Sequence, residues 1–205
     1  MKDCWAIVPV KDLDTGKSRL SSALGPADRV SLSLEMLGRV LAAAKEVQGL
    51  NKLVISPDER ALVLASEAGA NTLEDRWRGL NRSLGGALMW CSLRGAKSVL
   101  VLHADLPLLR SDDIMALIGL GSPAPAVVVA PSRREDGANA LFYNPPGIIP
   151  FAFGAGSFKA HLKLAAEQQV RTMIYRSPTT ALDIDTEEDL EAFRSQVPAH
   201  CGAPV

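Results

Sequence analysis

Three aspartates stand where they could act together on a phosphate. Asp105 comes almost directly after the most hydrophobic stretch of the chain, residues 98–103. A carboxylate there is costly to bury unless a cation or hydrogen bonds offset the cost. Asp183 and Asp185 stand two apart on a segment expected to be extended, so their side chains point to the same side. Because carboxylates from separate segments suit a hard Mg²⁺ ion that holds phosphates, we assign a metal site to Asp105 and Asp183.

The remaining carboxylate, Asp185, also has a structural interpretation. The four residues Thr186-Glu187-Glu188-Asp189 resemble a capping box, in which a side chain at the helix start binds a backbone N–H. Either Asp185 or Thr186 is therefore expected to cap the last helix. On this basis we treat Asp185 as mainly structural.

The cations that would accompany the aspartates come from residues 10–20, VKDLDTGKSRL. Gly16-Lys17-Ser18 matches the end of a phosphate-binding P-loop, but the full pattern needs a second glycine where this chain has Lys11. A lysine cannot take the positive-φ backbone of that loop at low cost. The segment is therefore not a P-loop. Lys17 and Arg19 remain candidates to neutralise charge on a transferring phosphate, and with the metal site they indicate a nucleoside di- or triphosphate ligand.

The composition limits the possible classes of function. With 205 residues and 47% hydrophobic content, the chain can bury one substantial core. A net charge of −1 gives no basic field for nucleic acid or anionic lipid. Three widely spaced cysteines offer neither a disulfide framework nor metal-ligand spacing. No stretch has the length of a membrane span and no signal-peptide pattern is present, so we expect a cytoplasmic protein without nucleic-acid or membrane partners.

The elements that must position these residues alternate between apolar strands and amphipathic helices. Strands are expected at residues 4–10, 52–56, 98–103, 126–130, 139–143 and 170–175. Helices are expected from Pro26, over residues 57–68 and 80–93, after Ser111 as N-cap, over residues 157–168 and after Thr186. This alternation favours an α/β fold: a single-domain three-layer sandwich with a mostly parallel sheet. The domain would span residues 1–197, and residues 198–205 would form a flexible tail.

Ligands of open parallel α/β sheets bind beyond the carboxyl ends of the strands. Four polar segments occupy such positions: the basic loop at residues 10–20 and residues 79–82, 103–107 and 182–186. The candidate metal ligands belong to the last two. The sequence therefore predicts one site at one edge of the sheet.

Several motifs occur in a characteristic order. They are Ile7-Val8-Pro9-Val10-Lys11 with Lys17-Ser18-Arg19-Leu20, Gly79-Leu80-Asn81, Asp105-Leu106-Pro107, residues 136–141 (DGANAL), residues 153–158 (FGAGSF) with His161, and residues 183–190 (DIDTEEDL). Together they resemble the guanylyltransferases of coenzyme F420 biosynthesis, which act on 2-phospho-L-lactate, phosphoenolpyruvate or 3-phosphoglycerate. The resemblance covers nearly the whole chain except the tail.

This resemblance implies a nucleotidyltransferase fold of the glycosyltransferase-A type and a Mg²⁺-dependent reaction. The phosphate of a three-carbon acid would attack the α-phosphorus of GTP, pyrophosphate would leave, and the product would pass to a deazaflavin-coupling transferase. Asp105 and Asp183 match the family's metal ligands, and Lys17 matches the loop lysine that faces the triphosphate.

The resemblance also implies substrate-binding residues. Asn139, Gly154 and Ser157 match positions that line the acceptor site. Asn81 and His161 are further candidates to bind substrate, although His161 could instead face solvent.

Other points stay open at the level of sequence. His103 is expected to be a hydrogen-bonded core histidine, whereas Trp77 lies in a loop near the presumed base site. Asp136 and Ala155 replace a glycine and a proline that many relatives carry, which leaves the acceptor open among the three acids. No residue that selects guanine can be named, and a homodimer is one expectation for the assembly.

Three alternatives are weighed against this interpretation. Another cytidylyl- or molybdopterin guanylyltransferase would often open with a glycine-rich Leu-x-Gly-Gly-x-Ser loop, which residues 11–16 do not match. A glycosyltransferase would normally carry Asp-x-Asp directly after the central strand, where only Asp105 stands. A non-catalytic nucleotide-binding regulator would be signalled by loss of a metal carboxylate, but Asp105 and Asp183 are both present.

Overall fold

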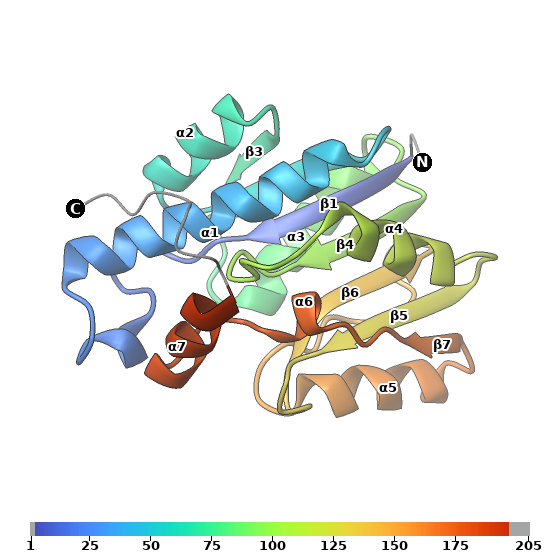
Figure 1. Ribbon diagram of the computed structural model, residues 1–205. Coiled ribbons are helices and arrows are strands. Elements are labelled where there is room, and N and C mark those ends of the chain that lie inside the picture. The colour runs from blue at the N-terminus through green and yellow to red at the C-terminus, as the bar shows by residue number, and fades with distance from the viewer. Residues whose placement is uncertain (1–2, 197–205) are drawn as a thin grey trace.

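A seven-stranded sheet forms the middle layer of the computed structural model, which describes residues 3–196 (Figure 1). The strands are β1 (Cys4–Pro9), β2 (Asn51–Ser56), β3 (Asn71–Glu74), β4 (Ser98–Leu102), β5 (Ala126–Pro131), β6 (Ala138–Asn144) and β7 (Arg171–Ile174). The helices are α1 (Pro26–Glu46), α2 (Glu59–Glu67), α3 (Leu80–Ser92), α4 (Ser111–Leu120), α5 (Ser157–Glu167), α6 (Pro178–Ala181) and α7 (Glu187–Gln196), with a short 3₁₀ helix, η1, at Ser18–Leu20.

The strand order is β3-β2-β1-β4-β6-β5-β7. β6 runs antiparallel to its neighbours β4 and β5, whereas every other pairing in the sheet is parallel. The predicted mostly parallel sheet is thus confirmed. One consequence matters for function: the carboxyl ends of the six other strands and the amino end of β6 meet at the same edge of the sheet.

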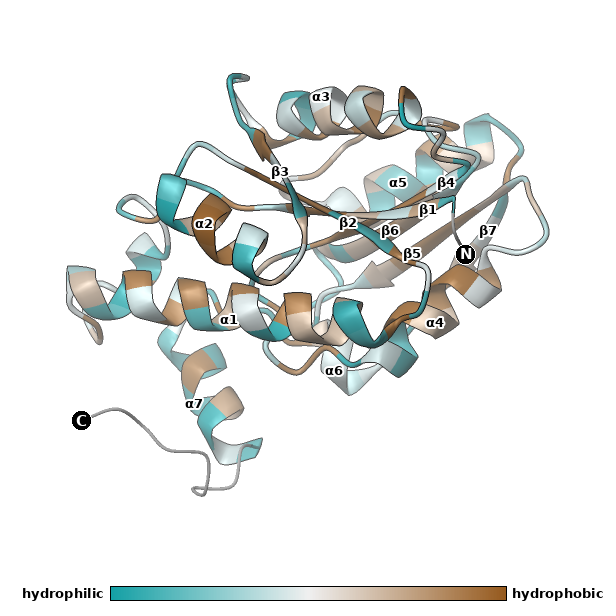
Figure 2. Cartoon of the chain, turned by 90° about the horizontal axis from the view of Figure 1, so that it is seen from above, coloured by the Kyte–Doolittle hydropathy of each residue, from teal (hydrophilic) through white to brown (hydrophobic). Residues whose placement is uncertain are grey.

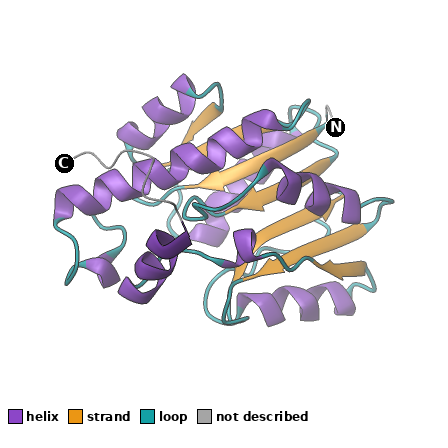
Figure 3. Ribbon diagram, in the orientation of Figure 1, coloured by secondary structure: helices purple, strands orange, loops and turns teal. Residues whose placement is uncertain are grey.

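Helices cover both faces of the sheet, as the alternation of side chains along β1 requires. Ala6 and Val8 pack on one face with side chains from α1, α2 and α4. Trp5 and Ile7 point to the other face, where α3 and α5 lie. Figures 2 and 3 show these helices on either side of the strands. The three-layer sandwich predicted from the sequence is confirmed.

A third apolar cluster lies beside the sheet and carries the C-terminal helix. Ile184, Leu190 and Phe193 from the α7 region pack against Leu20 of η1 and Met36 of α1. This packing holds the segment before α7 next to the loop after β1. Two segments that are far apart in sequence, residues 10–20 and 182–186, therefore become neighbours.

Three local predictions need correction or addition. Arg110, not Ser111, is the N-cap residue of α4, and its backbone N–H donates to Asp113 at 2.9 Å. β3 was not predicted because it is a four-residue edge strand, NTLE, with little apolar burial to mark it. The four-residue α6 was missed for the same reason of length. The predicted tail at 198–205 lies outside the described residues, and within residues 3–196 no helix is long and apolar enough to span a membrane.

Candidate active site

A cavity of about 760 Å³ opens at the shared strand edge. Its lining follows the order of the sheet: Asp75 comes after β3, Pro57 after β2, Lys11 after β1, Asp105 after β4, and Asn139 near the start of β6. The volume is typical of pockets that bind small ligands. Ligand binding at this edge is what the fold class predicts.

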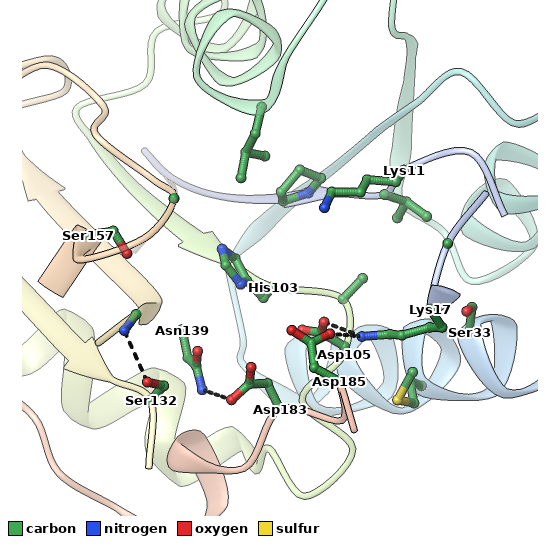
Figure 4. A pocket seen from close by; sticks show the side chains of 18 of the residues that line it. Lys11, Lys17, Ser33, His103, Asp105, Ser132, Asn139, Ser157, Asp183 and Asp185 are labelled. Atoms are coloured by element: carbon green, nitrogen blue, oxygen red, sulfur yellow. Dashed lines mark hydrogen bonds and ion pairs between the residues drawn. The ribbon is translucent and has the colours of Figure 1, made fainter. Parts of the chain in front are cut away.

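The loop after β1 is fixed at the cavity by a buried carboxylate. Asp58, the N-cap of α2, accepts the backbone N–H of Leu13 at 3.1 Å and ion-pairs with Arg60 at 2.7 Å. The hydrogen bond from the Arg60 side chain lowers the pKa of Asp58 to about 2, so this anchor is charged at neutral pH. Further along the loop, Lys17 adopts a left-handed backbone with φ of 52° and turns the chain into η1. This conformation turns the Lys17 side chain towards the carboxylates (Figure 4).

Lys17 joins two of the aspartates. Its ammonium lies 2.5 Å from Asp105 Oδ2 and 2.9 Å from Asp185 Oδ1 (Figure 4). Burial lowers the pKa of Lys17, but the carboxylates of Asp105 and Asp185 outweigh it, and the net pKa lies above its usual value. Burial likewise raises the pKa of Asp105, but the Lys17 ammonium outweighs it and holds the net pKa below the usual value. Lys17 and Asp105 are therefore both charged at neutral pH.

Asp183 lies near Asp105 in the cavity and is held by Asn139 (Figure 4). The Asn139 amide donates to Asp183 Oδ1 at 3.0 Å and to the carbonyls of Thr180 and Ala181 at 3.0 and 3.2 Å. Burial, together with the nearby charge of Asp105, raises the pKa of Asp183. Among residues 3–196, no lysine or arginine forms an ion pair with Asp183, in contrast to Asp105.

The carboxylates of Asp105 and Asp183 could form part of a metal site. Asp105 Oδ1 is buried and without a hydrogen-bond partner, which is a donor atom suited to a cation. Among residues 3–196, no three His, Cys, Asp or Glu side chains gather closely enough to hold a metal by themselves. Mg²⁺ commonly binds through one or two carboxylates plus substrate phosphates, so Asp105 and Asp183 fit a metal that arrives with a nucleotide.

The opposite end of the cavity is small and lined by α5 and the β5–β6 turn. Ser157, at the start of α5, accepts the Ala138 N–H through its hydroxyl at 2.9 Å. Gly154 has φ of 132°, a backbone region that favours glycine, and a side chain there would meet open space. Ser132 binds Asp136 and the Gly137 N–H at 2.9 and 3.1 Å and closes the turn. The cavity wall here presents backbone groups and hydroxyls rather than bulky side chains.

Asn81 and His161 do not line the cavity, which corrects the expectation that they contact substrate. The Asn81 amide exchanges hydrogen bonds with the Phe153 backbone at 3.0 and 2.8 Å. His161 is 0% exposed and accepts the Ala152 N–H at its Nε2, so the solvent-facing alternative is also wrong. Both side chains hold the loop at residues 151–154, one end of which reaches the cavity at Gly154.

His103 also differs from expectation. Its ring lies just beyond the end of β4 on the cavity wall, tilted against Phe153 at a centroid distance of 5.2 Å. Nε2 is buried without a hydrogen-bond partner, so His103 is not the hydrogen-bonded core histidine that the sequence suggested. Burial lowers the pKa of His103 and keeps the ring neutral at neutral pH. Its Nε2 is an acceptor or donor that the described residues do not satisfy.

Most of the other predicted site residues line the cavity. Lys17, Arg19, Asp105 and Asp183 all line the cavity, as do Asn139, Gly154 and Ser157. Asp185 was predicted to be mainly structural. The cap of α7 is instead formed by Thr186 and Asp189, and the Asp185 carboxylate forms an ion pair with Lys17.

Two further lining residues, Arg133 and Asp75, were missed. Arg133 follows the predicted strand β5, so the strand-end rule that found Asp105 could have found it, whereas Asp75 follows β3, which the sequence did not reveal.

The chemistry available here is the handling of phosphate esters. Carboxylates that fit a metal stand beside a lysine, and an exposed arginine, Arg19, lies on the same wall. Charges arranged in this way stabilise negative charge that develops on a phosphate during transfer.

Comparison with known proteins agrees with this chemistry. Residues 4–194 match the family model described as "Guanylyl transferase CofC like". A phosphoenolpyruvate guanylyltransferase of Rubrobacter xylanophilus is 40% identical over 91% of each chain. A 3-phospho-D-glycerate guanylyltransferase of Colwellia psychrerythraea is 32% identical over 90% of this chain and 88% of its own.

Solved structures support the fold. A 4-diphosphocytidyl-2C-methyl-D-erythritol synthase from Anaerococcus prevotii superposes with a TM-score of 0.63 at 10% identity, covering 94% of this chain and 96% of its own. At that identity the likeness concerns the fold alone, a nucleotidyltransferase fold. The family match and the curated relatives go further: this chain is a nucleotidyltransferase enzyme and belongs to the CofC-like guanylyl transferase family.

Proposed function

We propose that the protein transfers GMP from GTP to the phosphate of a three-carbon phosphoacid, with phosphoenolpyruvate as the first candidate, and releases pyrophosphate. The observation that carries the proposal is the meeting of Asp105, Asp183 and Lys17 in the middle of one cavity. The part of the cavity that runs from this centre to Asp75 after β3 is called the long wing here. The part on the other side of Asp105, which includes Asn139 and Ser157, is called the short wing. A nucleotide fits the first wing and a three-carbon acid the second.

Asp105 and Asp183 would hold Mg²⁺ in this reaction. The unpartnered Oδ1 of Asp105 and the cation-deficient Asp183 support that assignment. When bound, the metal neutralises triphosphate charge and stabilises the charge that develops at the reacting phosphorus. Asp185, which shares Lys17 with Asp105, adds a third carboxylate to the same wall.

Lys17 and Arg19 would bind the triphosphate. The Lys17 ammonium stands beside Asp105, so it reaches the position where the α-phosphate must lie if Asp105 binds the metal. The attacking phosphate monoester is already nucleophilic at neutral pH, and no strong general base is needed. Positioning and charge stabilisation by these side chains supply the main catalytic effect.

The acceptor would bind in the short wing of the cavity. Its carboxylate is an anion, and the backbone N–H groups at the start of α5 together with the Ser157 hydroxyl suit an anion. His103, whose Nε2 has no hydrogen-bond partner, also lines the cavity. Phosphoenolpyruvate is the first candidate because the Rubrobacter relative is named for this substrate. 3-Phospho-D-glycerate is the second because the Colwellia relative is named for it.

We place the reaction in coenzyme F420 biosynthesis, where a deazaflavin-coupling transferase would take up the product. The guanylylated acid contains a phosphoanhydride bond between GMP and the acid's phosphate and is therefore activated, so a group-transfer enzyme is the expected consumer. This placement rests on the family membership of the chain.

The test is pyrophosphate release in the presence of Mg²⁺. GTP, CTP and ATP are each combined with phosphoenolpyruvate, 2-phospho-L-lactate or 3-phospho-D-glycerate, and the coupling transferase is added to trap an unstable product. Turnover with GTP and phosphoenolpyruvate is the expected result. Turnover with CTP or ATP alone, or with none of the three acids in a protein that binds GTP, would overturn the proposal.

A further inference from the structure

The two wings of the cavity differ in length, which decides where a nucleobase can lie. From Asp105 after β4, the long wing crosses β1 and β2 to reach Asp75 after β3. Three strand spacings amount to roughly 14 Å. On the other side, the short wing crosses β6, where Asn139 lies, and reaches Arg133 after β5, two strand spacings or roughly 10 Å away. With the phosphates at Asp105, the longer side of the cavity, towards β3, is the one that suits the ribose and base.

Asp75 is the carboxylate at the far end of that wing. Its two oxygens accept the Trp77 N–H at 2.9 Å and the Ser83 hydroxyl at 2.7 Å. In the part of the chain that the structure describes, Asp75 has no ion-pair partner. An ionised carboxylate only accepts hydrogen bonds and has about four lone-pair sites, so both oxygens can accept a further donor.

The loop that carries Asp75 is held rigidly against α3. The Trp77 ring lies over Gly86, where an added Cβ would meet ring atoms at 2.5 Å. Ser83, one turn earlier on α3, supplies the hydrogen bond to Asp75. A carboxylate fixed at both oxygens is preorganised for a flat, two-point partner.

Another acid on the same wing, Asp12, is already used by its own turn. Asp12 Oδ1 accepts the N–H groups of Asp14 and Thr15, each at 3.0 Å. Asp75 also accepts an N–H of its own turn, from Trp77, but its second oxygen is bonded to Ser83 of α3, so a neighbouring helix fixes this carboxylate as well. Among the bases, guanine presents two adjacent donors, N1–H and N2–H, on one edge. Adenine and cytosine present a donor beside an acceptor there.

We infer that Asp75 selects guanine by accepting N1–H and N2–H of the base, an assignment that rests on the proposed function. Adenine or cytosine at this position would place a ring acceptor against a carboxylate oxygen. Such a mismatch places two acceptors against each other and repels. A bidentate contact of this type discriminates between bases by about 10- to 100-fold.

The first test uses the unaltered protein and nucleotide binding measured by calorimetry with Mg²⁺. Inosine triphosphate lacks the 2-amino group, so it should bind about 10-fold more weakly than GTP. Equal affinity for the two nucleotides would overturn the inference. This comparison needs no variant and does not depend on turnover.

The second test changes the side chain at position 75 that is proposed to contact the base. Asp75→Asn can donate to O2 of xanthine and accept from its N1–H, so the variant should bind GTP about 10- to 100-fold more weakly and gain affinity for xanthosine triphosphate. Ser83→Ala keeps the carboxylate and should retain the preference for GTP with a smaller loss. Glu74→Gln, an exposed neighbour paired with Arg76, is the matched control and should change neither affinity.

The outcomes separate this inference from the proposed function. If Asp75→Asn still prefers GTP while the unaltered protein turns over GTP with a phosphoacid, the role of Asp75 is wrong and the function stands. If the preference inverts but no acid is turned over, the role of Asp75 stands and the proposed acceptor is wrong.

Discussion

The ammonium of Lys17 lies 2.5 Å from Asp105 Oδ2, although 88 positions separate them in the sequence. Asp185 holds the same ammonium from the other side at 2.9 Å. Without a ligand, the lysine thus neutralises carboxylates that fit a metal. When a metal and a triphosphate bind, Lys17 is expected to exchange these carboxylates for phosphate oxygens.

This exchange predicts a response to Mg²⁺ alone. Lys17→Met leaves Asp105 and Asp185 without their cation and should lower the stability by about 2 kcal/mol, between the values for exposed and buried ion pairs. Because Mg²⁺ can replace the missing charge, it should raise the melting temperature of this variant more than that of the unaltered protein. Thermal unfolding with and without MgCl₂, in the absence of nucleotide, measures the difference.

The control for this experiment is Arg39→Met, which removes an exposed ion pair with Glu35 on α1. Its response to Mg²⁺ should match that of the unaltered protein. If Mg²⁺ raises the melting temperature of Lys17→Met only as much as that of the unaltered protein, the carboxylates do not bind the metal.

Asp105→Asn should abolish turnover and keep the fold. The substitution removes a charge at the centre of the cavity but preserves the shape of the side chain, and we expect a loss of kcat/KM of at least about 10²- to 10³-fold. Pyrophosphate release measures turnover, and circular dichroism checks the fold. Asp112→Asn, at an exposed position of α4, should leave activity unchanged. Substantial activity in folded Asp105→Asn would remove the metal assignment.

Asn81→Ala should weaken binding of the acceptor and not of the nucleotide. The variant loses both hydrogen bonds to the Phe153 backbone, so the adjoining Gly154 segment of the acceptor wing is no longer fixed. We expect KM for the phosphoacid to rise about 10-fold, a loss in line with one or two hydrogen bonds. Asn81→Asp keeps the hydrogen-bond acceptor and loses the donor. Its KM for the phosphoacid should lie between those of the unaltered protein and Asn81→Ala. A changed Kd for GTP with an unaltered acceptor KM would instead place Asn81 against the nucleotide.

The sequence was sufficient to predict the fold and the centre of the site. Asp105 could be found because a carboxylate after a strongly apolar strand needs a partner, and the strand-end rule explains why Lys17 and Asp183 meet it. Asp185 was misjudged because its neighbours form a capping motif. The spacing of Asp183 and Asp185 already indicated that both face the same side, and Thr186 with Asp189 supplies the cap.

What could not be predicted depends on which face of an element packs inward. His161 lies on an amphipathic helix, and the sequence does not show that its ring turns to the core, where Phe153 contacts it at a centroid distance of 4.8 Å. Asn81 has a motif position that is compatible with substrate contact or with bracing a loop. Only the three-dimensional packing of α3 against residues 151–154 distinguishes these roles.

The burial of His161 predicts a pH dependence of stability. Burial lowers the pKa of His161 to about 4, from 6.5 in an unfolded chain. Since the folded pKa is the lower one, the stability is complete above pH 6.5 and is lost as the pH falls towards 4, because the unfolded chain takes up the proton first. The shift corresponds to at most about 3 kcal/mol.

His161→Gln removes this titration and keeps an acceptor for the Ala152 N–H. Urea unfolding at several pH values from 7 to about 4.5 should therefore show a steeper loss of stability in the unaltered protein than in the variant. Both proteins retain His103, whose pKa is also lowered by burial, so its contribution cancels in the difference. Parallel pH profiles would mean that His161 is protonated as easily in the folded chain as in the unfolded one, and that the Ala152 N–H does not hold its ring neutral.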